Sequence, residues 1–393
     1  MTGATGVVKA SPPRRAPDPD DRDPTSRPAV VSDLPIFLVT DQGLGTGIGA
    51  YALSLLRLLQ PAFPRAELLS LAYLEEGDRP PGVRRLQGLR TVRRRAEVPW
   101  VRRQNRRTLR LALPADAAVH DCGPDYAVAR MFSRSVATVH DYYPRKPSID
   151  SLRQPIVLAR DVLSLASYVT LPAQVRGSRA VVVPTRHVQR RLRSEGGVES
   201  VVIPHWVDLL RFHPRDRGEA RRRLGLPAVS QLALNVGAGT SNKNPALLRR
   251  LARALPPGFT LVKVGAPLSP AEPQLLHIPS LSHDDYPLLF NACNVYVHPS
   301  LEEGFGRPLI EAIASELPIL ALDSDVAREV AGETARYLPR TATSSEWICG
   351  IREATEAGVT PEVRAAAKER QDVFSPEAAL RAYTDLYRRA FDL

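Results

Sequence analysis

Short apolar segments alternate with amphipathic segments of helical length through most of this chain. Apolar strands that alternate with helices are typical of parallel sheets covered by helices on both faces. The first block predicts strands at Leu34–Val39, Leu68–Ala72, Ala117–His120, Val136–His140, Ala180–Val183 and Val201–Ile203, with helices at Ile48–Gln60, Ile156–Tyr168 and His187–Arg193. The second block predicts strands at Leu232–Val236, Thr260–Val264, Val295–His298 and Ile319–Leu322, with helices at Pro245–Leu255, Asp284–Asn291 and Pro308–Ser315. We therefore expect an α/β protein with two doubly wound, Rossmann-like domains.

The alternation restarts near Trp206, so we expect the chain to divide there. A length of 393 residues suits two domains of ordinary size, and a hydrophobic content of 44% is enough to bury two cores. We predict a disordered leader at residues 1–33, domains at 34–205 and 206–371, and a final helix within 372–393 that crosses back to the first domain. In such sheets ligands bind beyond the carboxyl ends of the strands. The expected binding loops therefore follow Thr40, His140, Val236 and His298.

The composition excludes several classes of protein. No segment approaches the roughly 18 uncharged apolar residues that a membrane-spanning helix needs, since Ile156–Leu171 is interrupted by Arg160 and Asp161. Residues 1–34 lack an apolar core, so they do not resemble a signal peptide. The three cysteines are too far apart for a Cys-x-x-Cys zinc site, and their odd number argues against a disulfide framework. These features favour a cytoplasmic location.

The formal net charge of +11 is concentrated in one part of the chain. Lys and Arg number 53 against 42 Asp and Glu, and the segment Arg79–Arg110 alone holds twelve Arg against one Glu. A nucleic-acid binder would spread its positive charge more widely, so we expect no nucleic-acid partner. Four Arg of the segment share one face of a predicted helix, namely Arg103, Arg106, Arg107 and Arg110. Such a face is either solvated or contacts an anionic membrane surface or a phosphorylated acceptor.

The most informative segment is Val295–Leu322, which reads VYVHPSLEEGFGRPLIEAIASELPILAL. A predicted strand is followed by a loop and by a helix that begins with proline, a residue suited to the first helical turn. Gly304 and Gly306 permit a tight turn, and the unpaired N–H groups at the helix N-terminus attract an anion. Glu303 and Glu311 flank this turn, and carboxylates accept hydrogen bonds from pairs of hydroxyl groups. The pattern therefore implies a ligand that is an anion with hydroxyl groups on both sides, namely a nucleoside diphosphate sugar.

This segment resembles the donor site of GT-B glycosyltransferases of family GT4. The resemblance rests on E-G-F-G-x-P-x-x-E at Glu303–Glu311, with the following A-x-A-x-E-L-P-I-L and D-S-D-V-A-R-E-V-A-G. It also takes in T-V-H-D-Y-Y-P at Thr138–Pro144, V-I-P-H-W-V-D at Val202–Asp208, V-G-A-G-T-S-N-K-N at Val236–Asn244 and F-S-P-E-A-A-L-R-A-Y at Phe374–Tyr383. In all it covers roughly residues 34–391 and is more specific in the C-terminal half.

The resemblance implies a role for each matching residue. Lys243 is expected to hold the donor diphosphate, Glu303 the sugar hydroxyls and Glu311 the ribose diol. The implied catalytic residues are His140, Lys243 and Glu303, and the implied donor-binding residues are Gly47, Gly49, Lys243, Glu303, Gly304, Phe305, Gly306 and Glu311. His140 is expected to face the donor sugar, although a histidine at the end of a strand is more often a core residue. Ala238 and Ala50 stand where many members of the family carry arginine, and Arg307 is a candidate to replace one of these charges.

The loop Asp41–Ala50 reads DQGLGTGIGA and follows the first predicted strand. Its glycines fit the dinucleotide-binding pattern G-x-G-x-x-A, but the acidic residue expected at the end of the next strand does not follow. In the glycosyltransferase interpretation, Gly47 and Gly49 let the acceptor and the donor phosphate approach the backbone. A purely structural tight turn is the alternative.

Taken with the resemblance, the sequence predicts a GT-B enzyme with an acceptor domain at 34–205 and a donor domain at 206–371 that face a central cleft. The predicted reaction is a retaining hexosyl transfer without metal or cofactor, from a nucleotide-diphosphate sugar to a glycan or lipid-linked acceptor of polysaccharide biosynthesis. The Arg79–Arg110 segment would place the enzyme peripherally on the inner face of the plasma membrane. Two alternatives stay open: a nucleotide-sugar epimerase of the same fold, and a non-catalytic membrane or nucleic-acid adaptor that uses the Arg-rich segment.

Overall fold

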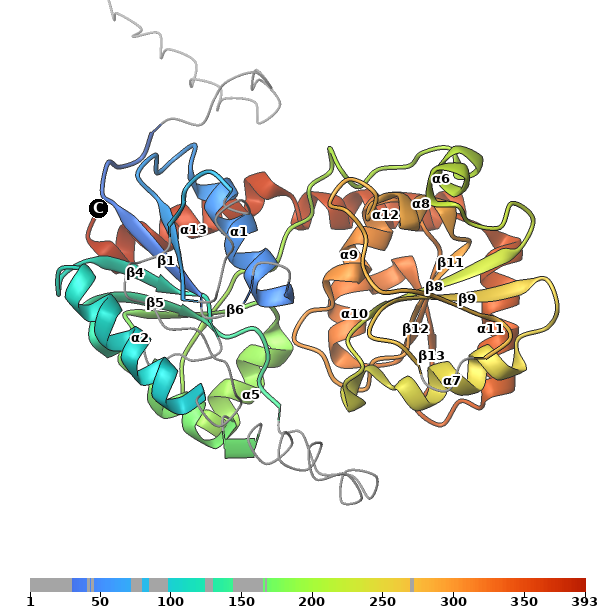
Figure 1. Cartoon of the computed structure of the whole chain (residues 1–393), viewed down its shortest axis with the longest axis horizontal. Coiled ribbons are helices and arrows are strands. Elements are labelled where there is room, and N and C mark those ends of the chain that lie inside the picture. Colours follow the sequence, from blue (N-terminus) through green and yellow to red (C-terminus); the bar gives the residue numbers. More distant parts are fainter. Residues whose placement is uncertain are drawn as a thin grey trace, which may run out of the picture.

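The computed structural model describes residues 30–40, 43, 46–71, 80–84, 98–123, 130–143, 165–166, 168–268 and 272–393. These residues form two parallel β-sheets, each covered by helices, in two domains that lie side by side (Figure 1). The predicted fold class, two doubly wound Rossmann-like domains, is confirmed. Most of the predicted leader and of the predicted helix Ile156–Tyr168 lies outside the described residues, as do residues 85–97 of the Arg-rich segment.

The N-terminal sheet has the strand order β3-β2-β1-β4-β5-β6-β7, and every pair of neighbours is parallel. Its strands are β1 (Ile36–Thr40), β2 (Glu67–Ser70), β3 (Val83–Arg84), β4 (Ala118–Asp121), β5 (Arg134–Thr138), β6 (Ala180–Val183) and β7 (Val201–Val202). The helices described around it include α1 (Gly47–Leu59), α2 (Val98–Ala112) and α5 (Arg186–Gly196). The strand order reverses between β1 and β4, which is where sheets of this kind bind ligands.

The C-terminal sheet has the strand order β10-β9-β8-β11-β12-β13 and is also parallel throughout. Its strands are β8 (Gln231–Gly237), β9 (Phe259–Gly265), β10 (Leu275–Ile278), β11 (Val295–His298), β12 (Ile319–Leu322) and β13 (Ala335–Leu338). Its helices are α6 (Arg217–Leu224), α7 (Pro245–Ala254), α8 (Leu288–Ala292), α9 (Arg307–Ala314), α10 (Asp325–Ala331), α11 (Ser344–Ala357) and α12 (Pro361–Val373). The order of this sheet reverses between β8 and β11.

Helix α13 (Pro376–Phe391) follows the C-terminal domain in sequence but packs into the core of the N-terminal domain. Figure 1 shows this helix passing from one domain to the other. Its buried side chains contact the apolar face of α1, and its two tyrosines enter a polar chain inside that core. The Tyr387 hydroxyl lies 2.5 Å from Nδ1 of His120, and the Tyr383 hydroxyl lies 2.5 Å from that of Tyr51. The crossing helix therefore completes the N-terminal domain.

Two predicted boundaries are wrong in ways that affect the site. Strand β5 ends at Thr138, so His140 lies two residues beyond the strand rather than within it. The predicted helix Asp284–Asn291 is a turn in its first half, and α8 begins only at Leu288. Ser282 and Asp285 hold that turn, because the Ser282 hydroxyl donates to the Asp285 carboxylate at 2.7 Å and accepts from the Asp285 N–H at 3.0 Å. Side-chain bonds of this kind compete with a helix.

Several elements were not predicted from the sequence. They include three strands at sheet edges, which lack the long apolar runs of buried strands: β3, β10 and β13. In β10 every residue is only half-buried. Three helices of the C-terminal domain were also missed, namely α6, α11 and α12. Strands and helices at the periphery bury less apolar surface, so their sequence periodicity is weaker.

Candidate functional site

The loops that follow β8 and β11 meet at the point where the strand order of the C-terminal sheet reverses. Asn242, in the first loop, donates a hydrogen bond of 3.1 Å from Nδ2 to the carbonyl oxygen of Glu302 in the second. The Leu301 N–H returns a bond of 2.7 Å to the carbonyl oxygen of Asn242. Because these loops end at the N-termini of α7 and α9, their contact brings the unpaired N–H groups of both helices close together. Ligands of doubly wound sheets bind at this position.

Lys243 and Glu303 form an ion pair between these two loops. Asn244 adopts the left-handed conformation (φ 54°) and caps α7 by accepting from the Leu247 N–H at 3.3 Å. This turn places the Lys243 ammonium group against the Glu303 carboxylate, to which it donates a hydrogen bond. Burial raises the pKa of Glu303, but the charge of Lys243 and its hydrogen bond outweigh burial and leave this pKa below its ordinary value. The Glu303 carboxyl is therefore ionised at neutral pH.

His298, the last residue of β11, lies beside Glu303. Its Nε2 is 4.0 Å from Oε1 of Glu303 and has no hydrogen-bond partner among the described residues, although the side chain is buried. Burial is the main cause that lowers the pKa of His298, to about 4, so its imidazole is neutral at pH 7. A neutral imidazole beside an ionised carboxylate offers a polar atom without adding charge.

Glu311, on α9, is held by a tyrosine. The Tyr286 hydroxyl donates a hydrogen bond of 2.7 Å to Oε2 of Glu311, and only 6% of the Glu311 residue is exposed. Burial raises the pKa of the Glu311 carboxyl, and the nearby charges of Arg307 and Arg211 and the Tyr286 hydrogen bond offset this only in part. The tyrosine fixes one carboxylate oxygen, which leaves Oε1 to accept hydrogen bonds from a ligand.

Gly304, Phe305 and Gly306 directly follow Glu303 and lead into α9. A Cβ atom at Gly304 would collide with the carbonyl oxygen of His140, so only glycine allows this approach. Gly306 has φ 81° and stands before the first turn of α9. The Phe305 ring is buried and packs edge-on against His205 at 4.9 Å and against Phe374 at 5.5 Å. The Phe305 side chain therefore anchors the loop.

His140 lies where the two domains meet. Its Nε2 is 3.2 Å from the carbonyl oxygen of Cys122, which requires the proton on Nε2 and leaves Nδ1 as an acceptor. The ring stacks on His205 at 5.5 Å and meets Tyr51 edge-on at 4.6 Å. Burial lowers the pKa of His140 to about 4, with a smaller contribution from the charge of Arg307. The imidazole is neutral at pH 7 and can position a ligand without carrying charge.

Gly47 and Gly49 lie in the first turn of α1, which Thr46 caps by accepting from the Gly49 N–H at 3.1 Å. A Cβ atom at Gly47 would meet nothing within 4 Å. Tyr51, one turn later, contacts His140, so the first turn of α1 lies on the same side of the N-terminal domain as Gly304. Residues 41, 42, 44 and 45 of the predicted glycine loop lie outside the described residues.

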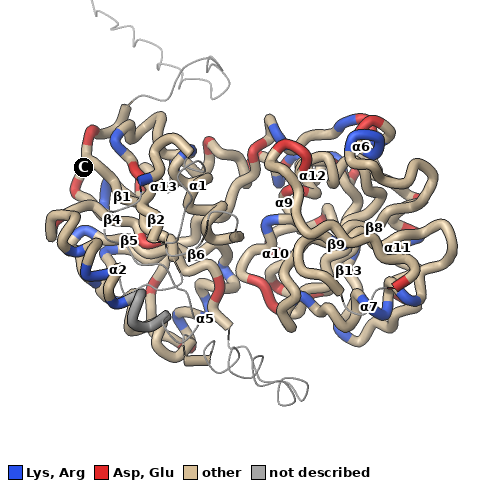
Figure 2. The backbone as a smooth tube through the Cα atoms, in the orientation of Figure 1, with Lys and Arg blue, Asp and Glu red and all other residues tan. Residues whose placement is uncertain are grey.

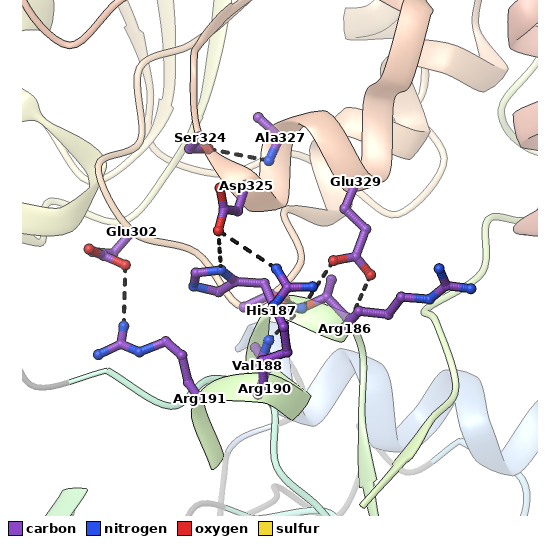
Figure 3. A network of polar contacts seen from close by, with 12 residues as sticks. Arg186, His187, Val188, Arg190, Arg191, Glu302, Ser324, Asp325, Ala327 and Glu329 are labelled. Atoms are coloured by element: carbon purple, nitrogen blue, oxygen red, sulfur yellow. Dashed lines mark hydrogen bonds and ion pairs between the residues drawn. The ribbon is translucent and has the colours of Figure 1, made fainter. Parts of the chain in front are cut away.

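The two domains are joined by a polar contact between α5 and α10 (Figure 3). The Glu329 carboxylate accepts the N–H groups of Arg186 at 2.6 Å and His187 at 3.0 Å, so it caps the first turn of α5 from the other domain. Asp325 lies 3.1 Å from Nδ1 of His187. The Thr185 hydroxyl donates a bond of 2.9 Å to the carbonyl oxygen of Gly304. This hydrogen bond links the domain interface to the loop that follows β11.

Sequence reasoning missed four polar residues of the site, namely Tyr286, His298, His205 and Lys263. Two of them carried a signal. His298 is a polar residue at the end of a buried strand, and Lys263 interrupts the apolar segment Phe259–Gly265. Tyr286 carried none, because it lies in the turn that was predicted as helix. His205 lies in the matching segment Val202–Asp208, but the resemblance implied no role for it.

The described residues contain no group of three or more His, Cys, Asp or Glu side chains arranged to hold a metal ion. Within the same residues, every helix is too short or too polar to cross a membrane. Lys and Arg residues gather along α2, on the side of the N-terminal domain away from the C-terminal domain (Figure 2). On this helix Arg103, Arg107 and Arg110 are exposed, whereas Leu109 is buried. The charged face of α2 is therefore turned outward.

The C-terminal domain is similar in sequence to a known protein family. Residues 216–370 match the family described as glycosyl transferases group 1. TuaC of Bacillus subtilis (strain 168), named as a proposed teichuronic acid biosynthesis glycosyltransferase, is 32% identical over 156 residues. The match covers 37% of this chain, and the chain spans 39% of the length of that relative.

Solved structures match nearly the whole chain. Sucrose-phosphate synthase from Thermosynechococcus elongatus is similar with a TM-score of 0.72 and 19% identity, over 91% of this chain and 99% of that one. Anabaena HepE in complex with UDP-glucose is similar with a TM-score of 0.65 and 18% identity, over 89% of this chain and 99% of that one. At these identities the likeness concerns the fold, which is GT-B.

Proposed function

Because residues 216–370 match the glycosyl transferases group 1 family, within a chain of the GT-B fold, we propose that this protein transfers a sugar from a nucleoside diphosphate sugar to an acceptor. The observation that carries the proposal is the pairing of Lys243 with Glu303 at the reversal point of the donor sheet, with Glu311 on the helix that follows. This set offers a cation to the diphosphate and carboxylates to the hydroxyls on either side of it. HepE, which has the same fold, binds UDP-glucose.

In this proposal the diphosphate lies near Lys243 and the N-terminus of α9. Negative charge grows on the diphosphate as its bond to the sugar breaks, and Lys243 stabilises that charge more in the transition state than in the ground state. Glu311 accepts hydrogen bonds from the ribose diol through the oxygen that Tyr286 leaves open. Glu303 accepts from the sugar hydroxyls, and the neutral His140 lies beside the sugar on the N-terminal domain.

The reaction is proposed to retain the configuration of the sugar and to need no metal ion. Lys243, Arg307 and the helix N-termini supply positive charge at the diphosphate from the protein itself. The N-terminal domain would hold the acceptor, a glycan or a lipid-linked molecule. The exposed face of α2 would bring the enzyme to the cytoplasmic face of an anionic membrane.

The first experiment is isothermal titration of the protein with UDP, GDP and ADP. A glycosyltransferase should bind at least one of them, whereas an adaptor that uses only α2 should bind none. The nucleotide that binds selects a panel of nucleotide sugars, whose slow hydrolysis by the enzyme is followed by NMR. Release of the sugar with its anomeric configuration retained supports the proposed reaction. Conversion of the nucleotide sugar to an epimer, with no release of nucleotide, would instead indicate an epimerase.

A further inference from the structure

Lys263 is a buried cation beneath the Lys243 loop. It lies in β9, and 1% of the residue is exposed. Its ammonium group donates hydrogen bonds to the carbonyl oxygens of Gly237 at 2.5 Å and Val264 at 2.8 Å. Gly237 is the last residue of β8, from which the loop with Lys243 departs. The lysine therefore holds the start of the loop that carries the diphosphate cation.

The charge of Lys263 has no opposite charge to compensate it in the part of the chain that the structure describes. No ion pair joins it to a carboxylate there, and the charge that acts on it most is the like charge of Lys243. Its neighbours on β8 and β10, Asn235 and His277, are paired with it in register. Burial and Lys243 together lower the pKa of Lys263 to about 8.

A buried cation costs free energy, so its place here calls for a reason. A neutral donor could satisfy the two carbonyl oxygens equally well. The Lys243–Glu303 pair is neutral as a whole, so it offers an incoming diphosphate little net attraction. The uncompensated charge of Lys263, close to that pair, supplies the missing attraction. It acts strongly because water is excluded around it.

We propose that Lys263 is a positioning residue of the donor site. It fixes Gly237, where the loop that carries Lys243 begins, and its buried positive charge attracts the diphosphate. This inference rests on the proposed function, since it assigns Lys263 to the same ligand. Lys263 does not touch the ligand, because its ammonium group is enclosed. It acts through the field that it adds and through the carbonyl of Gly237.

The test compares two variants and a control. Lys263→Met removes the charge and the donors, whereas Lys263→Gln removes the charge but keeps an N–H donor for Gly237. Lys368→Met removes the same charge from an exposed position on α12. Each protein is titrated with UDP, GDP and ADP, and the matching nucleosides are measured by competition. Melting curves report whether each variant folds.

We expect both Lys263 variants to bind the diphosphate about tenfold more weakly, a change of roughly 1.4 kcal/mol. Nucleoside affinity should change less than twofold, and Lys368→Met should behave as the unaltered protein. Full diphosphate affinity in Lys263→Gln would overturn the role of the charge. Equal losses for nucleoside and diphosphate, or a failure of both variants to fold, would make Lys263 a purely structural residue. Absence of nucleotide binding by the unaltered protein would overturn the proposed function as well, so the two failures are distinguishable.

Discussion

The Lys243 ammonium group donates a hydrogen bond to the Glu303 carboxylate across the loops that follow β8 and β11. Each residue thus holds the other in place. In the proposed donor complex, Lys243 offers its positive charge to the diphosphate and Glu303 offers its carboxylate to the sugar hydroxyls. Removing one partner leaves the other largely buried and unpaired, which is costly. The two residues should therefore respond differently in kinetics, because one meets the growing charge and the other meets hydroxyl groups.

Lys243→Ala should lower kcat by about 100-fold or more, in the range seen when one donor to a developing oxyanion is lost. Donor affinity should fall much less, because the charge on the diphosphate is smaller before the bond breaks. The measurement is a steady-state titration of the donor sugar nucleotide. Unchanged turnover at saturating donor would show that Lys243 acts only in binding.

Glu311→Ala should weaken nucleotide binding by about 1.5–3 kcal/mol, the usual value for hydrogen bonds to a charged group. The loss should disappear when the 2′-deoxy nucleotide replaces the ribonucleotide, because the ribose diol is then incomplete. Tyr286→Phe, which removes the hydroxyl that orients Glu311, should give a smaller loss of the same kind. The idea fails if Glu311→Ala affects ribo- and 2′-deoxynucleotides equally.

Glu329→Ala should loosen the contact between the domains, since this carboxylate caps α5 from α10. Small-angle scattering should report a larger radius of gyration for this variant. Glu356→Ala is the matched control, because Glu356 is exposed on α11. If the two variants scatter alike, the α5–α10 contact does not hold the domains together.

Replacement of Arg103, Arg107 and Arg110 with Gln should release the protein from anionic vesicles. Each basic residue near such a surface contributes about 1 kcal/mol, and the attraction falls as salt shortens the Debye length. The control replaces three exposed arginines of the donor domain, Arg217, Arg222 and Arg352. Sedimentation with vesicles at low and high salt measures the effect, and nucleotide binding should stay intact. No binding of the unaltered protein to anionic vesicles at low salt would reject the membrane role.

The affinity for the nucleoside diphosphate should decline as the pH rises from 7 to 9. The pKa of Lys263 is lowered to about 8, mainly by burial, so the folded protein loses this charge within that range. The terminal phosphate, with a second pKa of about 6, is already ionised there. Glu303 stays ionised throughout, because its pKa lies below its ordinary value.

Lys263→Met should flatten this pH profile. Loss of the Lys263 charge should not by itself lower the free energy of unfolding of this variant at pH 7. A lysine whose pKa falls on folding binds its proton more tightly in the unfolded chain, so the charged form opposes folding below about pH 8. The cost of burying the charged lysine falls, and the unaltered protein gains stability, as the pH rises from about 8 towards the ordinary pKa of lysine. A profile of equal slope in Lys263→Met would assign the pH dependence to another group.

The central part of the fold could be predicted because buried parallel strands are nearly continuous apolar runs. The sequence predicted β6, β11 and β12 with their observed bounds, and both domains followed from the alternation. Edge strands such as β10 escaped prediction, since a half-buried strand has no such run. The turn before α8 was mistaken for a helix because Ser282 and Asp285 compete with helical hydrogen bonds only once their side chains are placed.

The site was predictable where residues lie in one segment of sequence, and not where distant segments converge. Glu303 and Glu311 belong to one motif, so the sequence alone placed them together and suggested the roles proposed for them. Tyr286 reaches Glu311 from another loop, and Lys263 reaches Gly237 from the neighbouring strand. These contacts depend on which strands are adjacent, and the order β9-β8-β11 appears only in the folded sheet.

Helix α13 also has a consequence for the order in which the chain acquires its structure. Its tyrosines and Phe391 belong to the core that contains β1 and α1, yet the whole donor domain is synthesised between them. During translation the C-terminal domain can complete its core while the core of the N-terminal domain still lacks helix α13. The N-terminal half will therefore expose Tyr51 and its apolar neighbours to chaperones until residues 376–391 leave the ribosome.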